Sequence, residues 1–180
     1  GRNCGDFARG RQRLHRAGQH HTSDSLKRLT LDFLNGSSAD AGELARLHAK
    51  EWQHLYRDWD EKKALEDFRS QRTDGSIPAT LVLREDGRLV GSVSVLRDDC
   101  EARRDLGPWL ASLYVMPEKR GQGHGRRLIE AAIELAKRND TGCLHVFTES
   151  AEQLFLHHGF TRFAAAVTNG RAITILRREI

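Results

Sequence analysis

Three glycines at alternate positions, Gly121, Gly123 and Gly125, join an apolar stretch at residues 109–116 to a strongly helical segment at residues 125–138. Glycine has no Cβ, so it adopts positive φ angles and lets the main chain approach a ligand closely. The unpaired N–H groups at a helix N-terminus lie at the positive end of the helix dipole and bind anions. The order of strand, glycine-rich turn and helix therefore predicts a binding site for a phosphate or pyrophosphate group.

Two common phosphate-binding motifs do not fit this turn. A P-loop requires Gly-x-x-x-x-Gly-Lys-Ser/Thr, and no lysine follows the last glycine. The dinucleotide motif Gly-x-Gly-x-x-Gly, counted from Gly121 or Gly123, meets Arg126 or Leu128 in place of its third glycine. A plain flexible turn is the remaining alternative, but such a turn requires neither three glycines nor the preceding Arg120.

The apolar pattern outside this turn predicts a mixed α/β fold in one domain over residues 30–180. Apolar runs predict short strands at residues 30–34, 77–84, 89–96, 109–116, 144–148, 160–168 and 172–176. Helical spacing predicts helices after Ser38, after Asp58 or Asp60, and at residues 125–138 and 151–158. The predicted order is β-α-α-β-β-β-α-β-α-β-β, with Asn169-Gly170 as the clearest hairpin turn.

Positive charge is concentrated at the start of the chain. The net charge is +4, and residues 1–29 hold seven Lys or Arg and two Asp, which gives +5 and leaves −1 for residues 30–180. Residues 1–29 are predicted to be a basic, disordered extension because they are polar and aperiodic. A nucleic-acid-binding surface needs basic charge on the folded part or aromatic residues among the basic ones, and the extension holds only Phe7. We therefore do not expect nucleic acid as a partner.

The cysteines and the hydropathy of the chain indicate its expected compartment and exclude several kinds of partner. Cys4, Cys100 and Cys143 are odd in number and far apart, so they predict neither a disulfide framework nor a zinc site. Reduced thiols suit the cytoplasm. No apolar run approaches the roughly 20 residues of a membrane span, and the first residues lack a secretory signal. We expect no metal and no membrane partner, and the C-terminal hairpin could offer an edge for a homodimer.

Three segments together resemble the GCN5-related N-acetyltransferase (GNAT) family. Residues 120–125, Arg-Gly-Gln-Gly-His-Gly, are similar to its Arg/Gln-x-x-Gly-x-Gly/Ala signature. Residues 113–117 resemble the strand that leads into this loop, and residues 151–160 resemble the last short helix. The resemblance covers residues 30–180. It implies a mostly antiparallel sheet of about six or seven strands, about four flanking helices, and a splayed sheet that forms a cleft for coenzyme A.

The resemblance also implies that acetyl-coenzyme A is the cosubstrate. Main-chain N–H groups between Gln122 and Arg126 would hold the pyrophosphate, and the strand at residues 113–115 would pair with the pantetheine arm. The coenzyme-binding residues implied in this way are Leu113, Tyr114, Val115, Arg120, Gly121, Gln122, Gly123, His124, Gly125, Arg126, Thr148 and Phe155.

Acetyl transfer to an amine requires a base, because most amines are protonated at pH 7. We predict that Asp99 is this base, with Asp98 as a substitute; solvated turn carboxylates are the alternative. Many family members have a tyrosine, assigned as the acid, where this chain has Phe155. Either His158, His157 or water then assists the leaving thiol, or the thiolate leaves unaided, since thiols with a pKa of about 8.5 leave readily.

Aromatic residues after the first predicted helix indicate the acceptor pocket, because the first helices shape that pocket in this fold. Tyr56, Trp59 and Trp109 are predicted to line it, although core packing explains tryptophans equally well. The predicted function is N-acetyl transfer to a primary amine of a small molecule or a peptide N-terminus, by direct attack in a ternary complex. The alternative is a degenerate acyl-coenzyme A sensor or interaction module, which the missing tyrosine at Phe155 keeps open.

Overall fold

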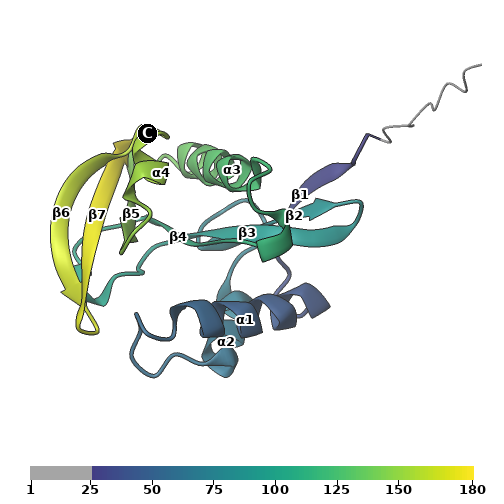
Figure 1. Ribbon diagram of the computed structural model, residues 1–180, viewed down its shortest axis with the longest axis horizontal. Coiled ribbons are helices and arrows are strands. Elements are labelled where there is room, and N and C mark those ends of the chain that lie inside the picture. The colour runs from purple at the N-terminus through teal and green to yellow at the C-terminus, as the bar shows by residue number, and fades with distance from the viewer. Residues whose placement is uncertain (1–25) are drawn as a thin grey trace, which may run out of the picture.

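The fold is an open mixed sheet with helices on both faces (Figure 1). The computed structural model describes residues 26–180, so most of the predicted extension at residues 1–29 lies outside the described residues. The strands are β1 (Leu29–Phe33), β2 (Ala79–Glu85), β3 (Arg88–Leu96), β4 (Trp109–Val115), β5 (Cys143–Thr148), β6 (Thr161–Thr168) and β7 (Arg171–Glu179). The α-helices are α1 (Ala39–Trp52), α2 (Glu61–Ser70), α3 (His124–Arg138) and α4 (Glu152–Leu156). This order confirms the predicted fold class.

The sheet divides between its two central strands. The strand order is β1-β2-β3-β4-β5-β7-β6, and only the β4–β5 pair is parallel among the described strands. That pair has a single register contact, Trp109 with His145, and the two strands then diverge. Figure 1 shows β5, β6 and β7 turned steeply away from β2, β3 and β4. The backbone groups that β4 and β5 present to each other beyond Trp109 are therefore open to another partner.

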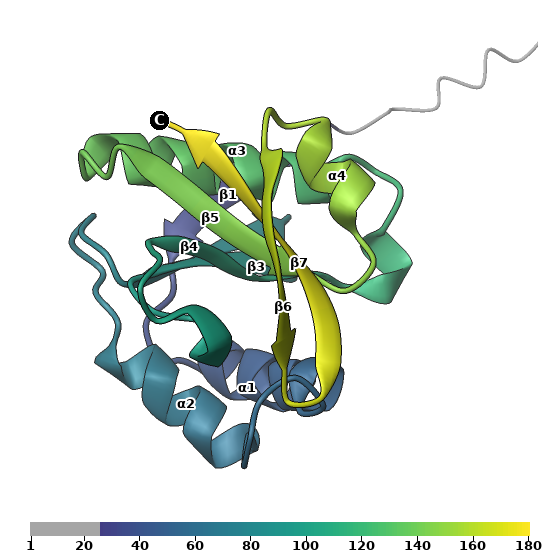
Figure 2. The ribbon, with the colours of Figure 1, turned by 90° about the vertical axis from the view of Figure 1, so that its left-hand side faces the viewer.

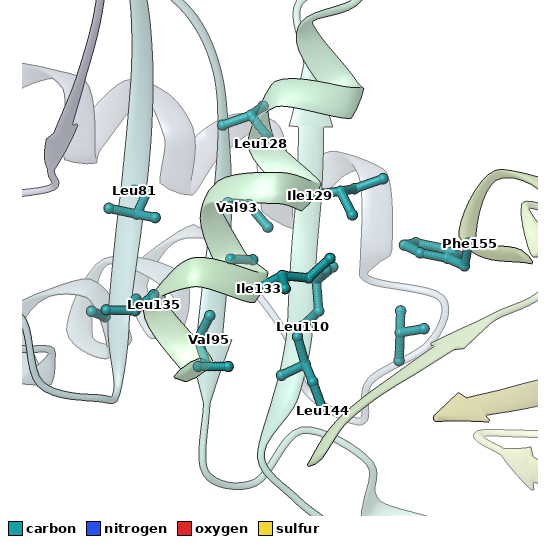
Figure 3. Packing of buried hydrophobic residues seen from close by; sticks show 14 of the residues in the cluster. Leu81, Val93, Val95, Leu110, Leu128, Ile129, Ile133, Leu135, Leu144 and Phe155 are labelled. Carbon is teal, nitrogen blue, oxygen red and sulfur yellow. The ribbon is translucent and has the colours of Figure 1, made fainter. Parts of the chain in front are cut away.

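Helix α3 covers one face of the sheet through its apolar stripe. Leu128, Ile129 and Ala132 are fully buried, and Figure 3 shows Leu128, Ile129 and Ile133 directed toward the strands. The facing strand residues include Val93, Val95, Leu110 and Leu144. Burial of one such side chain is worth about 1.5–3 kcal/mol, so this stripe fixes α3 and the glycine turn that precedes it.

Helices α1 and α2 cover the opposite face near β1–β3 (Figure 2). Both begin as the sequence predicts: Ser38 Oγ accepts the Ala41 N–H at 3.3 Å, and an Asp60 carboxylate oxygen accepts the Lys63 N–H at 2.8 Å. Of the two aspartates predicted as the second cap, Asp60 takes the role. Asp58 instead occupies a turn with a φ of 54°.

The edge of the sheet begins earlier than predicted. Leu29 is the first residue of β1, and the main chain of Arg28 is hydrogen-bonded to Asp86 in both directions, at 2.8 and 2.9 Å. Leu29 thus belongs to the sheet, and Arg28 is fixed to the turn between β2 and β3. None of the helices within residues 26–180 is both long and apolar enough to span a bilayer.

Candidate active site

The glycine-rich turn presents unpaired main-chain N–H groups at the start of α3. Gly121 and Gly123 have φ angles of 73° and 83°, and a Cβ on either would meet no atom within 4 Å. The first bond of the helical ladder is donated by Arg127 to the Gly123 carbonyl oxygen at 3.2 Å. Within the described residues, the N–H groups of residues 122–126 have no acceptor. The turn therefore leaves room for an anion and offers it several converging donors.

A hollow of about 330 Å³ lies in front of this turn. The β4 residues Leu113, Tyr114 and Val115 form one wall. Residues 119–121 and 123–125 form the other wall, and Glu51 and Leu154 also line the hollow. Most of the residues predicted to bind the coenzyme are thus brought together around one space.

Side chains of the turn contribute less to this hollow than its main chain does. Arg120 Nε donates to the Val115 carbonyl oxygen at 2.9 Å, and its guanidinium lies 5.7 Å from the Tyr114 ring centroid. The Gln122 amide bonds to the Glu118 carbonyl oxygen at 3.4 Å, and Arg126 pairs with Glu130 at 2.9 Å on the outer face of α3. Gln122 and Arg126 can therefore contribute their N–H groups, while their side chains are directed elsewhere.

The His124 side chain is the buried polar group of the turn. It is 5% exposed and lines the hollow, and neither ring nitrogen has a hydrogen-bond partner within residues 26–180. A buried polar atom without a partner costs roughly 1–3 kcal/mol. The imidazole therefore gains most when a ligand in the hollow supplies the missing partner.

A second cavity, of about 300 Å³, fills the split between β4 and β5. Leu110 to Leu113 line one side, and residues 146–151 line the other. Thr148 Oγ1 accepts the N–H groups of Ser150 and Ala151, at 3.3 and 2.8 Å, so its own hydrogen is free to donate to a ligand. Phe155 also lines this cavity and contributes an apolar surface only.

A β-bulge shapes the wall of this cavity. On β3, two residue steps separate Ser92 from Ser94, whereas their partners on β4, Tyr114 and Ala111, are three steps apart. The extra residue brings Ser112 to a φ of 51°. Bulges of this kind rotate the main chain out of the regular ladder, and here they direct it toward the split.

A third cavity, of about 210 Å³, lies between helices α1 and α2 and the strands β3 and β4. It shares Trp52, Tyr56, Asp99 and Ser112 with the cavity in the split. The two cavities therefore meet at these four residues, which form the junction between them.

Asp99 lies at this junction, and its pKa is close to neutral pH. The Tyr56 hydroxyl donates to its carboxylate at 2.9 Å. Burial raises the pKa of Asp99 to about 7, which the Tyr56 hydrogen bond partly opposes and the charges of Asp98 and Asp67 reinforce. Burial, followed by the charge of Asp99, raises the pKa of Tyr56 well above 10, so its hydroxyl remains a donor. Such a carboxylate can accept a proton at pH 7.

His48 lines the third cavity as a neutral side chain. It is 2% exposed, and burial lowers its pKa to about 3. Its Nε2 lies 3.3 Å from the Ser92 hydroxyl, and its ring packs edge-on against Trp52 and Phe68. The ring is therefore a wall of the cavity and carries no charge at neutral pH.

Three other residues predicted for the site, Trp109, His158 and Asp98, do not lie at the junction. Trp109 is fully buried, donates its indole N–H to the Leu106 carbonyl oxygen at 2.9 Å, and lines none of the three cavities. It packs in the core against residues of the C-terminal hairpin and the loop after β3, including Cys100, Ile173 and Ile175. His158 lines a separate hollow beside Arg126 and Glu130, outside the junction. Asp98 is exposed and lines the third cavity only.

Sequence reasoning missed several residues of the junction and of the third cavity. Trp52 and His48 follow the same helical spacing as core residues, so nothing separates them from the apolar stripe of α1. Asp67 lies beside Phe68 in a highly charged helix and has no distinguishing neighbour in the sequence. Ser112 is selected by the bulge alone, which is a property of strand pairing.

The fold and the site together define a class of protein. A mixed open sheet that splits between two parallel strands, with a glycine-rich helix N-terminus at the mouth of the split, is the acetyltransferase architecture that the sequence motifs imply.

Comparison with known proteins supports this class. Residues 77–162 match the model of the acetyltransferase (GNAT) domain. The uncharacterized N-acetyltransferase YhfO of Bacillus subtilis (strain 168) is 25% identical over 134 residues, which cover 72% of this chain and 89% of YhfO. Together, these two matches support assignment to the GNAT acetyltransferase family, with residues 77–162 as the matched domain.

Solved structures agree on the fold. The putative acetyltransferase yncA of Salmonella typhimurium, a structure with acetyl-CoA, is 23% identical with a TM-score of 0.63, covering 84% of this chain and 93% of yncA. N-acetylglutamate synthase of Neisseria gonorrhoeae, complexed with coenzyme A and N-acetyl-glutamate, is 23% identical with a TM-score of 0.60, covering 83% of this chain and 35% of the synthase.

Proposed function

We propose that this protein is an N-acetyltransferase that transfers an acetyl group from acetyl-coenzyme A to a primary amine, by direct attack in a ternary complex. The observation that carries the proposal is the meeting of two cavities at Asp99. One cavity runs along the split between β4 and β5 toward the glycine turn, and the other opens between α1 and α2. An enzyme that brings two substrates together needs this arrangement.

Residues around the split suit a long, amide-bearing thioester. The N–H groups at residues 122–126 would hold its pyrophosphate, since a Cβ on Gly121 or Gly123 would project into the same open space. Strand β4 would pair with the amides of the pantetheine arm in place of β5. The thioester supplies an activated carbonyl carbon and a leaving thiolate.

Asp99 would remove the proton that the attacking amine must lose. The amine nitrogen forms a bond to the thioester carbon, its proton passes to the Asp99 carboxylate directly or through water, and the carbon–sulfur bond breaks. Main-chain N–H groups near the bulge at Ser112 would stabilise the oxyanion, a role that the irregular ladder there supports. Phe155 has no proton to give, so the thiolate leaves unaided or takes a proton from water.

The proposal is tested by measuring free thiol release from acetyl-coenzyme A with a panel of primary amines. We expect amine-dependent release, with the acetylated amine identified by mass spectrometry. Saturable coenzyme binding without release for any amine would instead favour the acyl-coenzyme A sensor.

The glycine turn is tested by calorimetric titration with acetyl-coenzyme A. Gly123→Asp places a carboxylate against the pyrophosphate, and we expect coenzyme affinity to fall at least about a hundredfold. Gly87→Asp is the matched control, because Gly87 has a similar φ of 79° and an equally open Cβ direction in the β2–β3 turn. Equal affinity in the two variants would remove the turn from the coenzyme site.

A further inference from the structure

The third cavity, which the proposed function assigns to the acceptor, has aromatic walls. Trp52, Tyr56, Trp59 and Phe68 all line it. The Tyr56 and Trp59 ring centroids lie 5.4 Å apart. Aromatic faces attract cations that come within about 6 Å of the ring centroid, and groups of such rings enclose organic ammonium ions in other proteins.

The polar groups around the same cavity are predominantly acidic. Arg57 is its one Lys or Arg among the described residues, against four carboxylates: Asp67, Asp98, Asp99 and Glu101. Within residues 26–180, Asp67, Asp98 and Glu101 form no ion pair. Partial burial, followed by the charge of Glu66, raises the pKa of Asp67. Asp67, Asp98 and Glu101 are exposed, so they form an acidic rim around the cavity, and a cation that enters it would relieve the repulsion between these like charges.

The size of the cavity limits the acceptor. Sites for drug-sized ligands occupy roughly 300–1,000 Å³, whereas this cavity measures about 210 Å³. A peptide segment would not fit within it, but a short aliphatic chain would. Because Asp99 can take up only one proton, it can neutralise only one amine of such a chain, and the remaining carboxylates keep their charge.

We propose that the acceptor is a short aliphatic diamine, with one neutral amine at Asp99 and the second held as an ammonium ion between the aromatic walls and the carboxylates of Asp67, Asp98 and Glu101. This inference rests on the proposed function, which it narrows to a substrate class. The product keeps one positive charge and gains one amide. A single acetylation therefore removes the attacking amine without disturbing the group that positions the substrate.

Three primary amines of equal chain length test whether a second positive charge on the acceptor is needed, because the attacking amine is the same in all three. They are 1,4-diaminobutane, with a second cation; butylamine, with none; and 4-aminobutanoate, with an anion. We expect kcat/KM to be at least about tenfold higher for the diamine than for butylamine, and lowest for 4-aminobutanoate. The preference should shrink as salt rises, because rim charges are screened. Butylamine or 4-aminobutanoate reacting as well as the diamine would overturn the inference and leave the proposed function standing.

A pair of variants in α2 assigns the preference to the cavity. Asp67→Asn removes a carboxylate of the cavity, and we expect the ratio of diamine to butylamine kcat/KM to fall about fivefold. Glu66→Gln is the control, because Glu66 faces solvent beside Lys62 and does not line the cavity. An unchanged ratio in Asp67→Asn would contradict the placement of the second ammonium beside Asp67, Asp98 and Glu101.

Binding can be measured without turnover, which separates the two proposals. Two of the three tryptophans of the chain, Trp52 and Trp59, line the cavity, so their fluorescence reports its occupation. We expect 1,4-diaminobutane to change the fluorescence saturably and Asp67→Asn to weaken that binding. Binding without thiol release would sustain the cavity assignment and reject the transferase, whereas no binding together with release from butylamine would do the opposite.

Discussion

At the scale of the residue, Asp99 and Tyr56 form the pair on which the proposed chemistry depends. Tyr56 follows α1 and Asp99 follows β3, so the two residues lie 43 positions apart in the sequence and 2.9 Å apart through their oxygens. The hydrogen bond fixes the carboxylate at the junction of the two cavities. Burial keeps its pKa near 7, at which a carboxylate both ionises in the working range and accepts a proton effectively.

We predict that Asp99→Asn removes the acid limb of the kcat profile. Wild-type kcat should fall as the pH drops through about 7, because a protonated Asp99 cannot accept a proton. The Asn variant should be about a hundredfold slower at pH 8 and close to wild type at pH 5, where wild-type Asp99 is already neutral. Steady-state kinetics across pH 5–9 check this. Asp98→Asn is the neighbouring control and should retain the limb; its loss there would transfer the role to Asp98.

Asp99→Asn should stabilise the fold at the same high pH at which it lowers activity. Asp99 has a higher pKa in the folded chain, about 7, than the ordinary value of 3.8, so the folded state binds the proton more tightly. Wild-type stability therefore falls as the pH rises between these two values, and Asn cannot ionise. Urea unfolding at pH 5 and pH 8 should show Asp99→Asn gaining stability relative to wild type at the higher pH.

At the scale of the element, the site depends on how closely β3, β4 and α3 approach one another. Gly91 in β3 lies where the three elements meet. A Cβ there would lie 2.4 Å from the Tyr114 carbonyl oxygen and 3.1 Å from Leu128 Cδ1. The absence of a side chain thus lets α3 pack directly over the β3–β4 pair, and this packing places the glycine turn beside the split.

We predict opposite stability effects for two glycine-to-alanine changes. Gly91→Ala should destabilise the fold by about 1–3 kcal/mol, because it overpacks the contact of β3 with Tyr114 and Leu128. Gly42→Ala, within α1, meets no atom within 4 Å and should stabilise the fold by about 0.5–1 kcal/mol through helix propensity. Urea unfolding of both variants checks the pair. Equal effects would mean that β3, β4 and α3 are spaced more widely than described.

At the scale of the whole molecule, the end of the β6–β7 hairpin reaches back to the segment that follows α1 (Figure 2). The Asn169 amide, at the tip of this hairpin, donates to the His54 carbonyl oxygen at 2.9 Å. The His54 ring contacts Glu149 at 2.7 Å, and Arg171 lies 3.6 Å from the same carboxylate. These contacts tie the segment after α1, which borders the proposed acceptor cavity, to the half of the sheet formed by β5, β7 and β6.

We predict that Asn169→Gly loosens this connection without unfolding the protein. Asn169 has a φ of 46°, which glycine tolerates, so the change removes the side-chain hydrogen bond and adds no backbone strain. Amide hydrogen exchange in the peptide covering residues 53–57 should become about fivefold faster, as expected for a loss of about 1 kcal/mol. Exchange in α3 serves as the internal reference and should not change. Unaltered exchange at residues 53–57 would show that the hairpin tip does not restrain this segment.

Local signals in the sequence were sufficient for the elements and for the glycine turn. Ser38, Asp60, Asn169-Gly170 and the apolar stripe of α3 act through neighbours within a few positions, so their effects can be read from spacing alone. The predicted anion site at residues 120–125 belongs to the same category, because it needs only a turn and the helix that follows it, and no distant residues.

The proposed acceptor side of the site depends on contacts between distant segments, which the spacing of residues in the sequence does not reveal. Trp109 and Trp59 have the same side chain, yet pairing of β4 with β5 buries the first, and the position of α1 and α2 brings the second to a cavity. Asp99 differs from the exposed Asp98 through its burial beside Tyr56. A side chain's exposure, pKa and partners depend on which distant segments pack around it, and that packing exists only once the chain has folded.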